Sequence, residues 1–292
     1  MNKNKTYPSY LAFGTVAIYF VFLFLPGVLG IFYSFTDWNS FHPEVNFVGL
    51  SNYQRIIAPN QKYMDYISNT VIFTIATTLA KSALGILLAL LLTHKLVLGK
   101  ALHRMAIFTP LVMSYLVVGL VFKSLLHPAT GFVNIALRSV RLDFLANNWL
   151  SDASLALGTV ISVDTWKGVG YIMVVTIAGL KSISATYYEA AEIDGANYWQ
   201  RFLHITLPLI WPVLLTITIL NLTYGLRVFD IIYALTNGGP GHATDVINTA
   251  VFSAFSKGDY AMGTTLSTVL FVFVMAISYF LVKMMENKGE EL

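Results

Sequence analysis

Long apolar segments constrain this chain more than any other feature of its sequence. A helix needs about 20 predominantly apolar residues to cross the hydrocarbon core of a bilayer, and it satisfies its own backbone hydrogen bonds there. Six segments meet this requirement, at about 11–32, 68–92, 105–126, 155–180, 205–225 and 261–284. We therefore predict an all-α fold, a polytopic bundle of six transmembrane helices that forms one domain over residues 1–292.

The composition agrees with a membrane protein and excludes several other classes. Hydrophobic residues make up 56% of the 292 positions and charged residues 11%, whereas a soluble domain carries about 25% charged residues. The net charge of +3 is scattered, without the basic face that marks nucleic-acid binding. The absence of cysteine excludes disulfides and thiolate sites. Lys3 and Lys5 precede the first apolar segment, but that segment is long for a signal peptide and no small-residue cleavage site follows, so we expect a retained span.

The distribution of basic residues suggests an orientation. The two shortest linkers, 94–104 and 181–204, are dense in basic side chains, and such density favours the cytoplasm. These side chains are Lys95, Lys100, Arg104, Lys181 and Arg201. The longer linkers also carry Lys and Arg, so total counts discriminate poorly. With an even number of spans, we place both termini in the cytoplasm and predict ordered turns in the outer loop 33–67.

The segment 181–208, between the fourth and fifth spans, carries the most local information. Thr186 and Glu189 have the spacing of a capping box, in which the hydroxyl and the carboxylate each accept a backbone N–H, so a helix is expected to begin there. Glu192 and Asp194 then follow within the first turns, where acidic groups complement the helix dipole.

This first helix should be short. Gly195 would interrupt or bend it, since glycine weakens a helix interior by about 1 kcal/mol. A second short helix at 198–204 would lead into the fifth span, with Pro208 near its beginning. The result is a bent helix pair that projects from the membrane, and the alternative is an amphipathic turn that merely connects two spans.

Three motifs in this segment resemble the EAA loop of the inner-membrane subunits of ABC importers. They are Glu189-Ala190-Ala191, Asp194-Gly195-Ala196 and Ile205-Thr206-Leu207-Pro208. The resemblance implies a coupling helix that docks in a cleft on a nucleotide-binding subunit and transmits closure of the ATPase dimer to the membrane helices. The implied ATPase-coupling residues are Glu189, Ala190, Ala191, Glu192, Asp194, Gly195, Ala196 and Pro208.

The resemblance covers nearly the whole chain and extends to the sugar-permease branch, which includes the maltose and glycerol-3-phosphate importer subunits. The matching motifs are Asn69-Thr70, Phe108-Thr109-Pro110, Thr165-Trp166-Lys167-Gly168 and Leu235-Thr236-Asn237-Gly238-Gly239-Pro240. The last is the branch marker, although by itself it would indicate only a tight turn. The resemblance implies a permease for a sugar, an oligosaccharide or a sugar derivative in a bacterial cytoplasmic membrane. It also implies three partners: a second related permease subunit, a dimer of ATPase subunits that use ATP-Mg, and an extracytoplasmic sugar-binding protein.

Polar residues within the fourth and fifth spans are the candidate substrate site. Asp164 and Lys167 lie three residues apart on one helix face, and intramembrane charges normally face a bundle interior or a watery cavity. The alternatives are a mutually neutralising structural pair or an outward-snorkelling lysine. In the maltose-type importer the matching stretches line the sugar site, which implies Asp164, Lys167, Gly168, Tyr171, Asn221, Tyr224, Gly225 and Val228 here. This chain has Gly225 and Val228 where the maltose subunit has a polar asparagine, so the same sugar is not implied. A structural role for all eight residues, with the substrate held by the partner, is the alternative.

For Lys81 and the histidines we expect structural roles. Lys81 lies near the middle of the second span without an acidic residue within one turn, and we expect it to face the bundle or a partner helix. The six histidines lie mostly near predicted helix ends without metal-ligand spacing, so we expect interfacial residues and no metal site. They occupy positions 42, 94, 103, 127, 204 and 242.

Several motifs are missing from the sequence. It has no Walker A motif, and no HExxH or GxSxG, so we expect a transport subunit without a catalytic site, without its own cofactor and with its energy supplied by another chain. Two further hypotheses stay open. An ATP-independent secondary transporter or channel would need intramembrane carboxylates, of which Asp164 is the one clear case. An ABC permease for a non-sugar solute would share the EAA loop.

Overall fold

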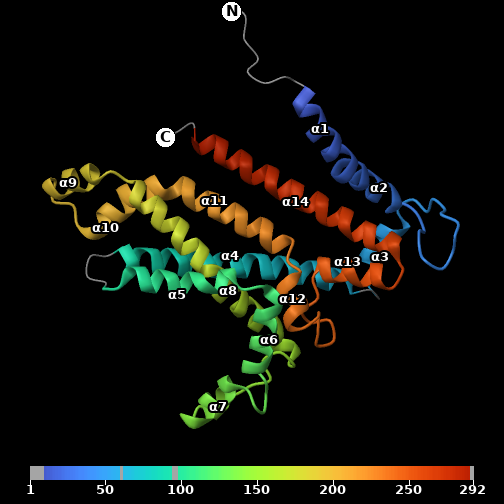
Figure 1. Ribbon diagram of the computed structural model, residues 1–292, viewed down its shortest axis with the longest axis horizontal. Coiled ribbons are helices and arrows are strands. Elements are labelled where there is room, and N and C mark those ends of the chain that lie inside the picture. Colours follow the sequence, from blue (N-terminus) through green and yellow to red (C-terminus); the bar gives the residue numbers. More distant parts are fainter. Residues whose placement is uncertain (1–9, 60–61, 94–97, 290–292) are drawn as a thin grey trace, which may run out of the picture. The chain divides into compact units, whose positions relative to one another are not determined.

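The computed structural model describes residues 10–59, 62–93 and 98–289 (Figure 1). The residues Lys3, Lys5, His94 and Lys95 discussed above lie outside this described part. The chain divides into two compact units, one of residues 1–64 and 250–272 and the other of residues 65–249 and 273–292. The predicted all-helical class is confirmed: apart from one β-bridge in the loop before α3, the described residues form no strand.

Helices make up most of the described chain. In order they are α1 (Tyr10–Tyr19), a π-helical turn (Phe20–Phe24), α2 (Leu25–Tyr33), α3 (Ser51–Ile57), α4 (Tyr63–Thr93), α5 (Lys100–Val112), α6 (Tyr115–Leu125), α7 (Phe132–Ser139), a 3-10 turn (Asp143–Leu145), α8 (Ala153–Ser182), α9 (Ala185–Ile193), α10 (Tyr198–Arg201), a π-helical turn (Phe202–Thr206), α11 (Leu207–Leu226), α12 (Asp230–Leu235), α13 (Ile247–Ser256) and α14 (Tyr260–Gly289).

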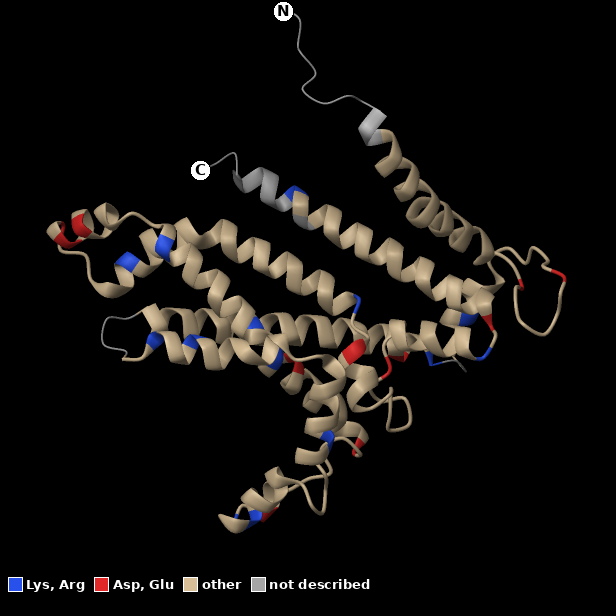
Figure 2. Ribbon diagram, in the orientation of Figure 1, with Lys and Arg blue, Asp and Glu red and all other residues tan. Residues whose placement is uncertain are grey.

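Five helical segments of the described chain are long and apolar enough to cross a membrane. They are Phe13–Tyr33, Tyr63–Thr93, Ala153–Ser182, Tyr198–Leu226 and Tyr260–Phe280. Each overlaps a segment expected from the sequence. Figure 2 shows α11 without a charged residue along its whole length, as a lipid-embedded helix requires.

The sixth expected span, 105–126, is not one straight helix. It consists of α5 and α6, which meet at an angle of 102°. Met113 and Ser114 between them have extended backbone, and the Ser114 hydroxyl accepts a hydrogen bond from the Val117 N–H at 3.3 Å. Serine competes with a continuing helix in this way because its side chain can satisfy the first N–H groups of a new one. The two halves together have the length and composition of the expected third span, which is therefore broken at Met113 and Ser114.

In the first unit, side chains hold the loop before α3 in place. The Asn52 amide donates to the carbonyl groups of Ser34 at 3.0 Å and Thr36 at 2.7 Å. Asp37 accepts the Asn46 N–H at 2.6 Å, and this hydrogen bond lowers the pKa of the Asp37 carboxyl. These contacts agree with the prediction of ordered turns in this outer loop.

In the second unit, α8 is the central helix. It packs along α5 and α11 and also contacts α12, while α6 packs on α12. Glycines allow the close approach: a Cβ at Gly85 in α4 would lie 2.5 Å from the Ile172 side chain of α8, and one at Gly119 in α6 would lie 2.6 Å from Ala234 of α12. Asp152 caps the start of α8 by accepting the Ser154 N–H at 2.8 Å. Four helices thus meet around the middle of α8, where the buried charges lie.

Candidate transport site and coupling helix

Buried charged and aromatic residues from four helices meet in the second unit. The Lys81 ammonium of α4 lies 2.6 Å from Oδ2 of Asp164 in α8, and the exposed fractions of the two side chains are 4% and 1%. Tyr224 of α11 donates its hydroxyl to Oδ1 of Asp164 at 2.8 Å and accepts the Tyr115 hydroxyl, also at 2.8 Å. The Lys81 ammonium also lies 4.5 Å from the centre of the Tyr224 ring, within cation–π range. Asp164 is the buried carboxylate of the described residues, and both of its oxygens have partners, one in an ion pair and one in a hydrogen bond.

Lys167 belongs to the same cluster but does not take the carboxylate. Its ammonium donates to the Leu111 carbonyl at 2.9 Å and lies 4.2 Å from the centre of the Tyr115 ring. Leu111 is in the last turn of α5, where carbonyl groups lack helical partners and a cation is favoured by the helix dipole. Lys167 thus contacts both sides of the break between α5 and α6.

The expected alternative of a neutralising pair between Asp164 and Lys167 is not what the structure contains. Among the described residues, Asp164 is ion-paired with Lys81, so Lys81 faces the interior of the bundle as expected. The partner lies on another helix, which a search within one turn of Lys81 could not reveal. The sequence did contain one signal for this ion pair. Asp164 is the one clear carboxylate predicted within a span, and a buried lysine needs a carboxylate partner. Tyr115 was missed because nothing in the sequence places the start of α6 beside α11.

The remaining candidate substrate residues divide into two groups. Gly168 belongs to the cluster, since a Cβ there would lie 2.8 Å from Cε of Lys81. Gly225 lets α11 approach α4, because a Cβ there would lie 2.8 Å from Cα of Thr74. Asn221, in contrast, donates to the Ile217 carbonyl of its own helix.

Two candidates lie apart from the charged cluster. Val228 is buried in the apolar core, and Tyr171 is 37% exposed. The structure therefore brings Asp164, Lys167, Gly168 and Tyr224 together with Lys81, and leaves Tyr171 and Val228 outside the cluster.

The first helix between the fourth and fifth spans begins two residues earlier than expected. α9 starts at Ala185, and its N-cap is Ser184, whose hydroxyl accepts the Thr186 N–H at 3.4 Å. The predicted capping box of Thr186 and Glu189 was therefore wrong. The reason is local, since Ser184 offers a hydroxyl two residues earlier and Thr186 already lies within the helix.

Gly195 ends α9, as the predicted interruption requires. Its φ of +78° lies in the left-handed region, which glycine reaches without steric cost. The Ala196 N–H donates to the Ala191 carbonyl at 2.9 Å, and the Gly195 N–H donates to the Glu192 carbonyl at 3.1 Å. This pair of bonds is the Schellman motif, so the glycine terminates the helix and turns the chain back.

The second half of the segment is continuous with the fifth span. Asn197 and Gln200 form a capping box that starts α10, and the helix then runs through the π-helical turn into α11 with Pro208 in its first turn. The expected second helix therefore begins at Tyr198 and leads into the fifth span as predicted, but it does not end near residue 204. The reason is the Asn197 cap, which starts a helix that continues through the π-helical turn 202–206, and Pro208 directly after this turn does not end it.

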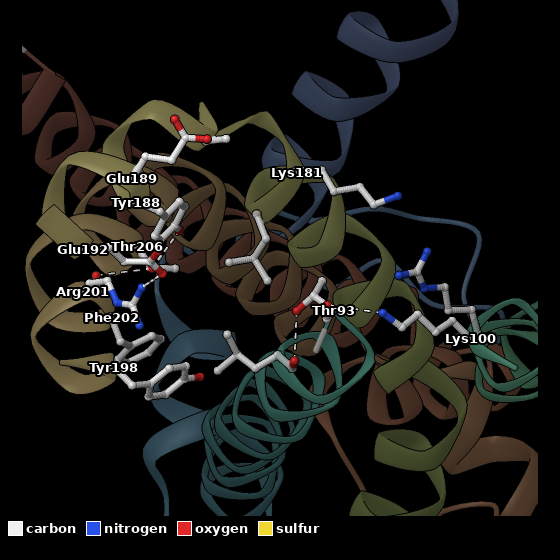
Figure 3. A pocket seen from close by; sticks show the side chains of 14 residues that line it. Thr93, Lys100, Lys181, Tyr188, Glu189, Glu192, Tyr198, Arg201, Phe202 and Thr206 are labelled. Atoms are coloured by element: carbon white, nitrogen blue, oxygen red, sulfur yellow. Dashed lines mark hydrogen bonds and ion pairs between the residues drawn. The ribbon is translucent and has the colours of Figure 1, made fainter. Parts of the chain in front are cut away.

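Two contacts hold α9 against this second helix (Figure 3). Arg201 forms an ion pair with Glu192, and the Tyr188 hydroxyl lies 2.9 Å from the Thr206 hydroxyl. We call residues 184–206, with α9 and α10, the coupling hairpin. It extends beyond the ends of α8 and α11 in Figure 1.

The outer face of the coupling hairpin is exposed and partly apolar. Ile193 is 88% exposed and Trp199 67% exposed, and Glu189 and Ala190 are also exposed. Of the other predicted coupling residues, Glu192, Asp194, Gly195 and Pro208 are exposed, while Ala191 and Ala196 are half-buried. Large exposed apolar side chains next to carboxylates are typical of a protein-binding surface.

Comparisons with known proteins agree with this architecture. Residues 81–287 match the family described as "Binding-protein-dependent transport system inner membrane component". The chain is 33% identical to the probable ABC transporter permease protein YurN of Bacillus subtilis over the full length of both chains. It is 34% identical to the multiple sugar-binding transport system permease protein MsmF of Streptococcus mutans, with 90% of each chain covered.

A solved structure has the same fold. It is a bacterial ABC transporter involved in the import of the acidic polysaccharide alginate, and a chain of it is 25% identical with a TM-score of 0.82 over 96% of both chains. The long apolar helices, the match over residues 81–287 and the full-length relative lead to one conclusion. The chain belongs to the family of inner membrane components of binding-protein-dependent transport systems.

Proposed function

We propose that this chain is a permease subunit of an ABC importer that carries a saccharide, such as an oligosaccharide or a sugar derivative, across a bacterial cytoplasmic membrane. The observation that carries the proposal is the exposed coupling hairpin at the ends of two long apolar helices. A surface of this kind can receive force from a soluble partner and pass it to α8 and α11, to which it is continuous in sequence. The relatives supply the saccharide class, since they include MsmF and the trehalose/maltose permease MalF of Thermococcus litoralis, which is 34% identical.

In this proposal, the energy for transport comes from ATP hydrolysis by another chain. ATP-Mg binds to a separate ATPase dimer, and this chain contributes the coupling hairpin, with Glu189 and Gly195 as its most important residues. A second related permease completes the path, because six spans are too few to seal one. A binding protein delivers the ligand from outside, as suggested by a similar permease chain solved in complex with an alginate-bound periplasmic protein. Both termini lie in the cytoplasm, and transport follows alternating access around a site near the middle of the bundle.

The buried cluster around Asp164 is the proposed place where the transport path is controlled. Tyr115 and Tyr224 present aromatic faces and hydroxyl groups of the kind that bind sugar rings and their hydroxyls. Lys81, Asp164 and Lys167 hold these rings through the contacts described above. We assign substrate contact to this cluster and to the nearby Gly168, Asn221 and Gly225.

Co-purification tests the coupling assignment. The importer is purified through a tag on this chain, and the amount of bound ATPase is compared for the unchanged chain, for Glu189→Arg with Gly195→Val, and for the control Asp143→Asn, an exposed residue away from the hairpin. We expect the ATPase to remain with the unchanged chain and the control and to be lost from the double variant. ATP-driven uptake that persists in the double variant without bound ATPase would overturn the proposal.

Ligand binding by the cognate binding protein tests the saccharide class. That protein is titrated calorimetrically with neutral oligosaccharides, acidic sugars, amino acids and metal ions. Tight binding of a saccharide supports the proposal. Tight binding of an amino acid or a metal, without saccharide binding, would replace the sugar by that solute and leave the ABC permease assignment in place.

A further inference from the structure

A cavity lies beneath the coupling hairpin, and basic residues line it. Its volume is about 840 Å³, and the ends of α4, α5 and α8 enclose it together with α9 and α10 (Figure 3). Four of its lining residues are cationic: Lys100 and Arg104 at the start of α5, Lys181 at the end of α8, and Arg201 of α10. Two carboxylates, Glu189 and Glu192 of α9, also line it. We call the four cationic residues and the space between them the basic cavity.

Its positive charge is only partly neutralised by the chain itself. Arg201 is paired with Glu192. In the described part of the chain, no carboxylate forms an ion pair with Lys100, Arg104 or Lys181. Figure 3 shows Lys100 and Lys181 on the same side of the cavity, across from Arg201 and Glu192. Lys100, Arg104 and Lys181 therefore have no acidic ion-pair partner among the described residues.

Helix capping explains part of this arrangement. The Lys100 ammonium donates to the Thr93 carbonyl at 3.4 Å, and the Arg104 guanidinium donates to the Leu92 carbonyl at 3.2 Å. Both carbonyls belong to the last turn of α4, where cations complement the helix dipole. Other donor groups of the three cations take no part in this capping. Nε of Arg104 is buried without a hydrogen-bond partner among the described residues, and Lys181 is exposed in the last turn of α8.

The side chains of Lys100, Arg104 and Lys181 line one cavity together. An anion with several oxygens fits such a cavity, because it can neutralise several cations at once. A phosphate group has that geometry and charge. The side chains thus point to a phosphate-like ligand rather than to a single carboxylate.

The depth of the basic cavity suggests where the phosphate comes from. Two candidate membrane spans end beside it, at Thr93 and Ser182, and a third begins at Tyr198. The cavity therefore lies where the helices leave the hydrocarbon core, at the depth of lipid headgroups. Tyr188 and Tyr198 line it, and aromatic residues with a polar end are enriched at this depth. Basic pockets between membrane helices on the cytoplasmic side bind anionic headgroups.

We propose that the basic cavity binds the phosphate group of an anionic phospholipid from the cytoplasmic leaflet. The lipid neutralises Lys100, Arg104 and Lys181 and holds the coupling hairpin to the ends of α4 and α5. This inference rests on the proposed orientation, with the hairpin in the cytoplasm. It does not depend on the transported solute.

The test measures lipid retention by the complete importer, purified in detergent. Native mass spectrometry counts bound phosphatidylglycerol and, for comparison, phosphatidylcholine. The variant carries Lys100→Gln, Arg104→Gln and Lys181→Gln, and the matched control carries Lys123→Gln, Arg138→Gln and Arg141→Gln, three cations outside the cavity lining. A basic residue near a membrane surface contributes roughly a fivefold factor to binding of an anionic lipid, so the variant should lose about a hundredfold in affinity. The control should equal the unchanged protein.

Three outcomes would overturn the proposal. They are equal retention of phosphatidylglycerol by variant and control, equal retention of the two lipids by the unchanged importer, and displacement of the lipid by low-millimolar inorganic phosphate, which would assign the cavity to a free anion. If the triple variant does not assemble, Lys181→Gln alone should reduce retention about fivefold, and this exposed side chain forms no ion pair in the described chain that the substitution would break. Bound ATPase is measured in the same samples, so failure of the lipid site and failure of the importer assignment are seen separately.

Discussion

The buried charges of this protein depend on one carboxylate. Asp164 accepts from Lys81 and Tyr224, while Lys167 relies on a backbone carbonyl and an aromatic ring. A buried ion pair contributes little compared with apolar residues of the same volume, but removing one member leaves an uncompensated charge. The cluster is therefore sensitive to single substitutions and tolerant of paired ones.

We predict that Asp164→Asn strongly destabilises the protein, because it leaves the buried Lys81 ammonium without its carboxylate partner. The loss should be about 3–5 kcal/mol. The double variant Lys81→Met with Asp164→Asn should recover part of it, since the unpaired charge at Lys81 is gone. Thermal unfolding of the purified importer measures both, and the exposed Asp143→Asn serves as the control. Equal losses in the single and double variants would contradict the ion pair.

At the scale of elements, two backbone interruptions shape the molecule. The break between α5 and α6 carries Lys167 on the Leu111 carbonyl, and Gly195 ends α9 in a left-handed conformation. In the first case a lysine side chain donates to an unpaired carbonyl group at the helix end. In the second, glycine lets the chain turn so that the following N–H groups donate to such carbonyl groups. Each interruption is therefore held by residues that can be changed individually.

Replacement of Lys167 by methionine should loosen the break in the third span. A hydrogen bond to a charged group contributes about 1.5–3 kcal/mol, so backbone amides around Met113 to Val117 should exchange about tenfold faster or more. Hydrogen–deuterium exchange of the importer in detergent measures this. Lys167→Arg keeps the charge and should exchange more slowly than Lys167→Met. Unchanged exchange in the methionine variant would show that Lys167 does not hold the break.

Substitution of Gly195 should act through the backbone alone. A Cβ there meets nothing within 4 Å, so the cost of Gly195→Ala is the left-handed conformation, about 1–2 kcal/mol. Gly195→Asn should cost less, since asparagine visits this region more readily. ATPase activity of the assembled importer, stimulated by loaded binding protein, should fall in the order Gly, Asn, Ala. Gly158→Ala is the control, because Gly158 is helical and also has open space around it, so equal effects at both positions would refute the assignment.

At the scale of the whole molecule, the second unit joins its membrane helices to the coupling hairpin without a flexible connection. α8 leads directly to α9, and α10 continues into α11. The same α8 and α11 carry Asp164 and Tyr224. A movement of the hairpin therefore reaches the charged cluster through two continuous helices.

This arrangement predicts transport driven by ATP and not by an ion gradient. Uptake of ligand into proteoliposomes that contain the complete importer should require internal ATP. It should continue when a protonophore or a sodium ionophore removes the gradients. Uptake that stops with the ionophore and continues without ATP would favour a secondary transporter, in which Asp164 would be the proton or ion relay.

The sequence determined the class of fold and the position of the coupling hairpin. Apolar segments long enough to cross a membrane form helices, because the hydrocarbon core offers the backbone no hydrogen-bond partner outside the segment itself. Gly195 could be recognised because helix termination is local chemistry, and motif spacing identified the coupling hairpin. Even within the hairpin, the sequence misplaced the first cap, since Ser184 and Thr186 both offer a hydroxyl and the choice between them depends on where the preceding helix stops.

Only the tertiary structure decided the partners of the buried charges. Asp164 could pair with Lys167 on its own helix or with Lys81, which lies far away in sequence, and packing of α4 against α8 selected Lys81. The same holds for the break in the third span, which Lys167 stabilises from a neighbouring helix. The physical reason is that helix formation in a membrane is set by local composition, whereas the pairing of buried charges is set by which helix faces meet.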